Sequence, residues 1–131
     1  MSQPRLNALV VDEKMFRHLA VLEMPKAIRL QYPISVLTIV RADGTAESLA
    51  GIVRRLVRAA DLVGRVAPQP AVRVLLMNAD LKGAQMVIDR ILAELAGSIF
   101  VRWGLACFPA TVRTADDLLA QADAAAGLAT T

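Results

Sequence analysis

The chain has 131 residues, a formal net charge of +3 and a hydrophobic fraction of 56%. This length suits one domain with its own buried core, so we expect a single domain over residues 1–131. The longest apolar runs are broken by charge well short of a membrane span, and we therefore expect no membrane insertion. The lone Cys107 has no second cysteine to pair with, which favours a reducing, cytoplasmic location.

A long helix is predicted near the start of the chain. Apolar residues recur at helical spacing over about 12–31, and Asp12 has the side chain of an N-cap. The Tyr32-Pro33 pair ends this helix, because the residue before a proline is pushed away from helical angles. The β-branched residues of 34–40 then predict a buried strand.

Turn residues and periodic segments divide the rest of the chain. Asp43-Gly44-Thr45 predicts a turn, and the two prolines within 67–70 leave room only for the turn of a hairpin. The predicted elements are a helix over 45–60, strands over 62–66 and 71–77, a helix over 80–95, a strand over 98–108 and a final helix from Thr114.

The order of these elements indicates the fold class. Without its first and last helices the chain runs strand, helix, strand, strand, helix, strand, which is the ferredoxin-like βαββαβ unit. We therefore predict an α/β fold of the α+β sandwich kind, in which an antiparallel sheet carries helices. This core spans about 33–127 and follows the N-terminal helix of about 12–31. Many unrelated functions use this fold, so the order alone indicates no activity.

Arginine is unevenly distributed along the chain. Twelve of the fifteen basic residues are arginine, and between Ser48 and Ala79 five arginines accompany a single acidic residue, Asp61. Such a segment attracts anions, although an exposed helix face followed by strand-edge arginines gives the same pattern. Aromatic residues are sparse and not interleaved with the arginines, so we expect no nucleic-acid partner. One histidine, one cysteine and scattered carboxylates predict no metal site.

Several local segments carry a resemblance to a known family. They are 32–37, 58–66, 101–106, and 116–119 with 122–125. In this order and at these spacings they resemble a GGDEF domain, the family that contains the diguanylate cyclases, over roughly 12–126. The resemblance implies a bacterial signalling domain with a ferredoxin-like core of the nucleotide-cyclase type, and a further strand after Ala126.

The five signature positions of that family are where this sequence departs from it. Aligned without a gap from Arg58, they fall on Ala67-Pro68-Gln69-Pro70-Ala71, and no signature residue survives. In the family the glycines let nucleotide approach the backbone, and the acidic residues hold metal. The other metal carboxylate falls on or near Val40, and the substrate-binding stretch shortens to 41–45. The resemblance therefore implies a degenerate domain without diguanylate cyclase activity and without a cofactor, because phosphoryl transfer rests on positioning and charge neutralisation.

A pair of charged residues precedes the altered signature. Arg58-x-x-Asp61 ends five residues before it, and in the resembled family an RxxD at this distance is the inhibitory site for the product, cyclic di-GMP. A guanidinium bonds two guanine acceptors at once, and a carboxylate accepts from the base's N–H donors. Arg90 is a candidate second arginine, and Arg54, about one turn before Arg58, is a further candidate contact.

Other readings of these residues stay open. Arg113-x-x-Asp116 has the same spacing without the neighbouring signature, and Arg58 with Asp61 could form only an exposed ion pair at a helix end. The chain is then either an inactive signalling domain that binds cyclic di-GMP, or a protein-interaction or homodimerisation module that binds no nucleotide. In the second case the first helix is the contact surface. An enzyme of unrelated chemistry on this frame is the third hypothesis.

Overall fold

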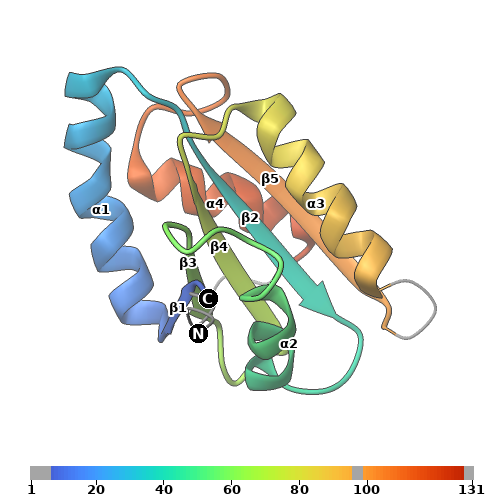
Figure 1. The fold of residues 1–131 in the computed structure, drawn as a ribbon. Coiled ribbons are helices and arrows are strands. Elements are labelled where there is room, and N and C mark those ends of the chain that lie inside the picture. The colour runs from blue at the N-terminus through green and yellow to red at the C-terminus, as the bar shows by residue number, and fades with distance from the viewer. Residues whose placement is uncertain (1–6, 96–98, 129–131) are drawn as a thin grey trace, which may run out of the picture.

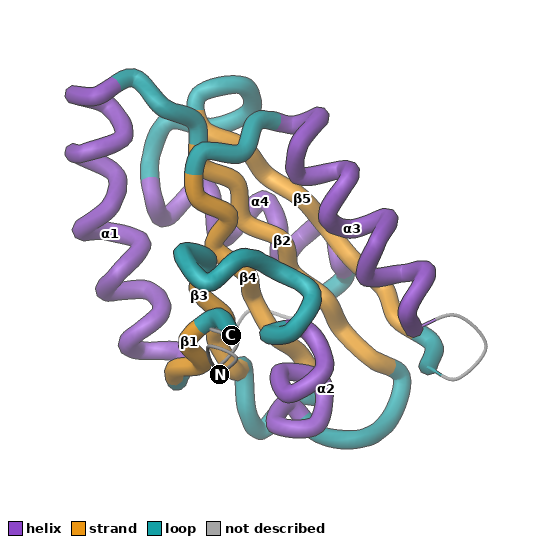
Figure 2. Tube along the Cα trace, in the orientation of Figure 1, coloured by secondary structure: helices purple, strands orange, loops and turns teal. Residues whose placement is uncertain are grey.

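The computed structural model describes residues 7–95 and 99–128, and contains one five-stranded sheet with helices on both faces (Figures 1 and 2). Its elements are β1 (Leu9–Val11), α1 (Glu13–Leu30), β2 (Ile34–Arg41), α2 (Ala46–Val53), β3 (Leu62–Arg65), β4 (Ala71–Met77), α3 (Leu81–Leu95), β5 (Val101–Phe108) and α4 (Ala115–Ala126). The predicted strand start at Ser98 lies outside the described residues, as does the chain beyond Leu128, where the resemblance implies a further strand. Among the described helices, none has the length and apolarity needed to cross a membrane.

The sheet has the strand order β1-β3-β4-β2-β5. Strands β2 to β5 pair antiparallel and, with α2 and α3, form the predicted βαββαβ core. The sequence does not predict β1, because three residues are too few for a periodic pattern to mark a strand. This strand pairs in parallel with β3, with Leu9 opposite Leu62, so the sheet is mixed and not wholly antiparallel.

Alternation along the strands divides the core into two layers. Successive side chains of a strand point to opposite faces, so Leu37 and Ile39 of β2 pack with α2 and α3, whereas Ile34 and Val36 pack with α1 and α4. Figure 1 shows α1 and α4 on one side of the sheet and α2 and α3 on the other. The first and last helices, which lie outside the βαββαβ unit, therefore cover the face that this unit leaves open.

Helix α2 is shorter than the sequence predicts. It ends at Val53 and not near residue 60, because the N–H groups of Arg55 and Leu56 bond back only three residues, to Ile52 and Val53, at 3.3 and 2.9 Å. This tightened turn stops the regular helix. The segment 58–61 therefore lies in the loop between α2 and β3, and not at the end of a helix.

Helix α4 packs on β5 at unusually close range. A Cβ placed on Gly104 of β5 would lie 2.2 Å from the carbonyl oxygen of Ala122 and 2.4 Å from the amide nitrogen of Ala126. Only glycine allows a backbone to approach this closely. The contact sets the depth of α4 on the sheet, and with it the position of Asp123 on the buried side of that helix.

Candidate functional site

The turn between β3 and β4 holds the five positions, 67–71, at which the resemblance places the family signature. The N–H groups of Gln69 and Ala71 are donated within this hairpin, to Val66 O at 3.0 Å and Gln69 O at 2.8 Å. Pro68 and Pro70 have no N–H to donate. Four of the five positions therefore keep no free backbone donor for a phosphate oxygen.

An apolar cluster fills the base of the same hairpin. Val40, near the end of β2, lies opposite Ala71 in the sheet register and is buried. The cluster consists of Val40, Val66, Ala71, Ala126 and Leu128. Magnesium and calcium require oxygen ligands. At the position where the resemblance implies a metal carboxylate, the structure thus has a buried valine.

The loop after β2 is covered by one of the chain's own side chains. The Arg41 guanidinium folds over Gly44 so closely that a Cβ there would lie 2.4 Å from its Cζ atom. Arg41 Nη1 donates to Ser48 Oγ at 3.0 Å, and Nη2 lies 3.8 Å from a carboxylate oxygen of Asp43. Asp43 is almost fully exposed, as a turn residue should be. In the described part of the chain, no three His, Cys, Asp or Glu side chains gather as a metal site.

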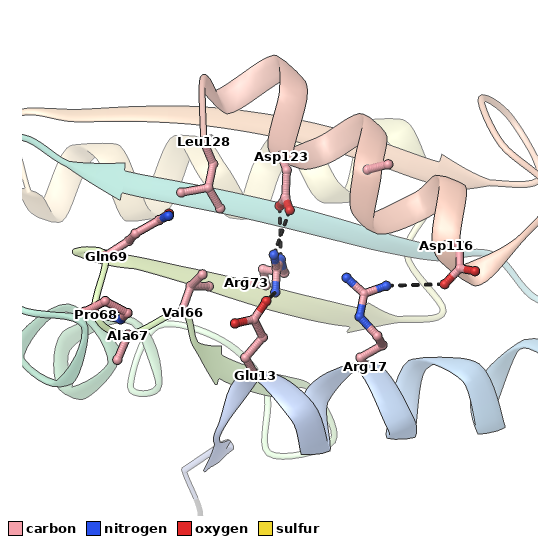
Figure 3. A pocket seen from close by; sticks show the side chains of 11 residues that line it. Glu13, Arg17, Val66, Ala67, Pro68, Gln69, Arg73, Asp116, Asp123 and Leu128 are labelled. Atoms are coloured by element: carbon pink, nitrogen blue, oxygen red, sulfur yellow. Dashed lines mark hydrogen bonds and ion pairs between the residues drawn. The ribbon is translucent and has the colours of Figure 1, made fainter. Parts of the chain in front are cut away.

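A buried ion pair lies beside the hairpin, between the sheet and two helices (Figure 3). Arg73 of β4 donates to both carboxylate oxygens of Asp123 on α4, from Nε at 3.0 Å and from Nη2 at 2.7 Å. Its Nη1 reaches Glu13 of α1 at 3.3 Å, and the Thr38 hydroxyl donates to Asp123 at 2.7 Å. Burial alone lowers the pKa of Arg73, but the hydrogen bonds and charges of Asp123 and Glu13 outweigh it and raise the pKa above its usual value.

This ion pair forms the floor of a hollow of about 430 Å³, which Figure 3 shows between the hairpin turn, α1 and α4. Arg73, the cation in this floor, already bonds the carboxylates of Asp123 and Glu13, which neutralise its charge. At the rim, Arg17 pairs with Asp116 at 3.3 Å. The hollow therefore lies beside the altered signature but presents charges that are paired inside the protein.

The sequence gives a signal for this pair that is easily missed. Arg73 interrupts the otherwise apolar strand 71–77, in which every other residue except Met77 is also buried. A buried guanidinium requires a carboxylate partner. The partner, Asp123, is fifty residues away on α4, and no local pattern indicates which of the chain's acidic residues it is.

The second charged region surrounds Asp61, in the loop before β3. Asp61 is 2% exposed, and its two oxygens accept from the backbone N–H groups of Met77 and Arg58, both at 3.0 Å. Nε and Nη2 of Arg58 lie 3.5 Å from the same carboxylate, and Nη2 also donates to the Met77 carbonyl oxygen. Asp61 thus joins the loop to the end of β4 and holds the Arg58 side chain in place.

Arg58, Asp61 and Arg90 line one groove of about 520 Å³, between the α2–β3 loop and α3. Arg90 reaches across from α3, and its Nη1 donates to the Leu56 carbonyl oxygen at 3.2 Å. More than half of the Arg58 side chain is exposed. The structure therefore brings together three of the four residues that the sequence singles out, although they come from a loop and a helix far apart in the chain.

Arg54 is not part of this groove. Arg54 is the C-cap residue of α2. Together with Arg65 of β3 it lines a different hollow, of about 270 Å³. Its Nε atom is buried and has no hydrogen-bond partner. The prediction that Arg54 lies one helical turn before Arg58 assumes a helix that continues past 54, and the early end of α2 removes that geometry.

Comparison with solved structures gives the fold a name. The GGDEF domain of TpbB, also called YfiN, from Pseudomonas aeruginosa superimposes with a TM-score of 0.81 at 22% identity, over 92% of this chain and 84% of that chain. The active GGEEF domain of a diguanylate cyclase from Vibrio cholerae gives 0.78 at 16% identity, over 89% and 88%. The GGDEF domain of DgcB from Caulobacter crescentus, solved in complex with cyclic di-GMP, gives 0.76 at 14%, over 88% and 82%.

This chain has the fold of the GGDEF domains. The similarity to the TpbB domain covers 92% of this chain, and it confirms the predicted nucleotide-cyclase type of core. At the level of sequence, no family model matches the chain, and the search of curated proteins finds no match either. At these identities the comparison establishes the fold, and activity must be argued from the residues themselves.

Proposed function

We propose that this chain is a catalytically inactive GGDEF-like signalling domain that binds cyclic di-GMP in the groove of Arg58, Asp61 and Arg90. The observation that carries the proposal is the convergence of these three residues, from the α2–β3 loop and from α3, on one groove of about 520 Å³. The arginine side chains are exposed there, and Asp61 is buried behind them. An exposed pair of guanidinium groups suits a ligand with two phosphates and two guanines.

In this proposal the three residues have different roles. Asp61 already accepts two backbone N–H groups and has almost no exposed surface, so its role is to hold Arg58 in place. Arg58 and Arg90 make the ligand contacts, to guanine acceptors or to phosphate oxygens. This differs from the sequence-based expectation, in which the aspartate itself accepts from the guanine edge.

The loss of catalysis is supported by three separate features at the hairpin. Its turn keeps few free N–H donors, Val40 is packed in an apolar cluster, and Arg41 covers the loop after β2. Phosphoryl transfer requires positioned phosphates and metal-borne charge neutralisation. Together these features leave the hairpin end of the sheet without the means for either.

Calorimetric titration with cyclic di-GMP tests the binding proposal. We expect saturable heat for the unaltered protein and at least about a tenfold weaker affinity for Arg58→Ala, since a charge-assisted hydrogen bond contributes about 1.5–3 kcal/mol. The matched control is Arg113→Ala, which removes an arginine from the same R-x-x-D spacing outside the groove and should bind as the unaltered protein does. Absence of heat at high micromolar ligand, or equal affinity for Arg58→Ala, would contradict the proposal.

Turnover of GTP tests the inactivity proposal separately. We expect the purified protein with GTP and magnesium or manganese to form no cyclic di-GMP above a blank of denatured protein. Product above that blank would sink this half of the proposal while leaving the binding half intact, because the two rest on different regions.

A second candidate function is that of an interaction or dimerisation module that binds no nucleotide. It is favoured by large apolar side chains left exposed on α1 and at its ends, namely Leu9, Met15, Val21, Leu22, Ile28 and Leu30. Exposed apolar side chains gathered on one helix favour a contact surface. Light scattering over a concentration series tests self-association, and a strict monomer counts against the dimer form of this function.

A further inference from the structure

The outer face of α1 combines apolar and basic side chains. Phe16, Ala20, Met24 and Ala27 of this helix are buried against the sheet, so at 3.6 residues per turn the opposite side carries positions 14, 18, 21, 22, 25 and 29. All six are exposed, and they are Lys14, His18, Val21, Leu22, Pro25 and Arg29. We call these six residues the outer face. Figure 1 shows α1 at the edge of the molecule.

The outer face has an apolar centre and a cation at each end. Val21, Leu22 and Pro25 occupy the middle of this face. Lys14 lies near the first residue of the helix, and Arg29 lies near the last. Exposed apolar residues continue at Leu9 in β1, before the helix, and at Leu30, its last residue, with Met15 and Ile28 on its flanks. Several large apolar side chains exposed along one helix are a mark of an interaction surface.

The acidic residues of α1 pair with other cations, and Asp12 and Glu47 line a hollow together with Lys14. Glu13 bonds Arg73 in the buried network, and the largely buried Glu23 accepts from Tyr32 at 2.7 Å and pairs with Lys26 at 3.1 Å. No ion pair is present for Lys14 or Arg29 among the described residues, which span all of α1. The outer face thus presents a net positive charge around an apolar centre.

This charge pattern disfavours a second copy of the chain as the partner. Antiparallel pairing of two α1 helices about the point between Val21 and Leu22 sets Lys14 of one copy opposite Arg29 of the other. Parallel pairing sets each cation opposite itself. Like charges brought face to face destabilise a helix pair, so this pattern favours an occupant that carries negative charge.

We infer that the outer face of α1 docks on an anionic lipid surface. A helix with apolar side chains at its centre and Lys and Arg around them lies in the membrane interface, where the apolar groups enter the headgroup region and the long basic side chains reach the phosphates. A lipid surface contacts the apolar centre of the outer face and the cations at both ends of the helix at the same time. This is adsorption to one surface and involves no spanning segment, in accord with the described helices.

Vesicle sedimentation with the full chain tests the inference. We expect the protein to sediment with vesicles of phosphatidylglycerol mixed with phosphatidylcholine, to stay in solution with pure phosphatidylcholine, and to be released by high salt. Leu22→Asp should abolish sedimentation. Lys14→Glu with Arg29→Glu should weaken it at least about 30-fold, because each cation near such a surface contributes about a factor of five.

Matched controls separate the outer face from general effects. Met86→Asp places the same charge on α3, at a residue that is 61% exposed compared with 55% for Leu22. Lys82→Glu with Arg55→Glu removes two exposed cations elsewhere. Both controls should sediment as the unaltered protein does, and circular dichroism should show every variant folded.

Three outcomes would overturn the inference. Failure to sediment with either vesicle would leave the outer face to an acidic protein, and equal sedimentation with both would remove the role of charge. A dimer in light scattering that Leu22→Asp converts to a monomer would assign the face to a second copy. None of these results depends on cyclic di-GMP, so they are distinct from a failure of the proposed function.

Discussion

Two regions of this molecule are each built on a buried aspartate that bonds an arginine, and they differ in how much of the arginine reaches solvent. Beside the hairpin, Asp123 bonds Arg73, whose side chain is 4% exposed. Beside α3, Asp61 bonds Arg58, whose side chain is 58% exposed. The same two residue types therefore form a buried ion pair in one region and leave a cation exposed to solvent in the other.

The contrast lies in how each arginine's charge is neutralised. Arg73 has bonds to two carboxylates from two helices, so its charge is neutralised inside the protein. The carboxylate oxygens of Asp61 accept hydrogen bonds from two backbone N–H groups at 3.0 Å. They lie 3.5 Å from the side-chain nitrogens of Arg58. Asp61 and the Met77 carbonyl oxygen hold the Arg58 guanidinium in place, while more than half of its side chain remains exposed to solvent.

The largest effect on stability should come from breaking the buried pair of Arg73 and Asp123. Asp123→Ala leaves the Arg73 guanidinium buried without its main partner, and its raised pKa keeps it charged. We expect a loss of about 3–5 kcal/mol in the free energy of unfolding, measured by denaturant titration. Arg17→Ala breaks the exposed pair with Asp116 and serves as the control, with an expected loss of about 0–1 kcal/mol. Equal losses in the two variants would contradict a structural role for Asp123.

Asp61→Ala should have the next largest effect on stability. The substitution leaves the backbone N–H groups of Met77 and Arg58 without their acceptor in a partly buried position, and we expect a loss of about 2 kcal/mol. Asp43→Ala removes an exposed carboxylate from a turn and should change stability by no more than about 0.5 kcal/mol. If Asp61→Ala is as stable as the unaltered protein, the carboxylate does not hold the loop to β4.

Most of the secondary structure could be predicted from the sequence. The elements from α1 to α4 follow from periodicity and from turn residues, and Thr114 caps α4 where the pattern places it. The sequence does not reveal β1, which depends on a parallel contact with β3 fifty residues away, nor the early end of α2, where apolar periodicity continues through Leu56 and Val57 although the hydrogen bonds change.

The candidate site follows the same division. Spacing before the altered signature singles out Arg58 and Asp61, and the structure brings Arg90 to the same groove. Spacing along a chain cannot show that Asp61 is buried and occupied by backbone donors, because the donor of one of them belongs to Met77 on another strand. A contact between distant segments is fixed by the packing of the sheet, and a local pattern contains no record of it.

A smaller effect is expected from the second arginine of the groove. Arg90→Ala removes one exposed guanidinium whose only described bond is to the Leu56 carbonyl oxygen, so the fold should be unaffected within about 0.5 kcal/mol. The affinity for cyclic di-GMP should fall by about tenfold, which calorimetric titration measures. Unchanged affinity would confine the ligand to the Arg58 side of the groove and would remove Arg90 from the proposed site.

The smallest effect is expected from Arg54, the residue on which sequence and structure disagree. If the chain continued as a helix to residue 60, Arg54 would lie one turn from Arg58 and would share its ligand. In the structure α2 ends at Val53, and the Arg54 side chain lines a different hollow beside Arg65. Arg54→Ala should therefore bind cyclic di-GMP within about twofold of the unaltered protein, since a charge outside the site acts only through a screened field.

The Arg54→Ala measurement also bears on the contrast between the buried Arg73 and the exposed Arg58. Its Nε atom is buried without a partner, so the residue resembles neither the neutralised Arg73 nor the exposed Arg58. A tenfold loss of affinity in Arg54→Ala, with Arg58→Ala less affected, would mean that the ligand binds on the Arg54 side of the α2–β3 loop and that the exposed arginine of the groove is not the recognition element. Because both variants remove one positive charge from the same segment, their difference isolates position from net charge.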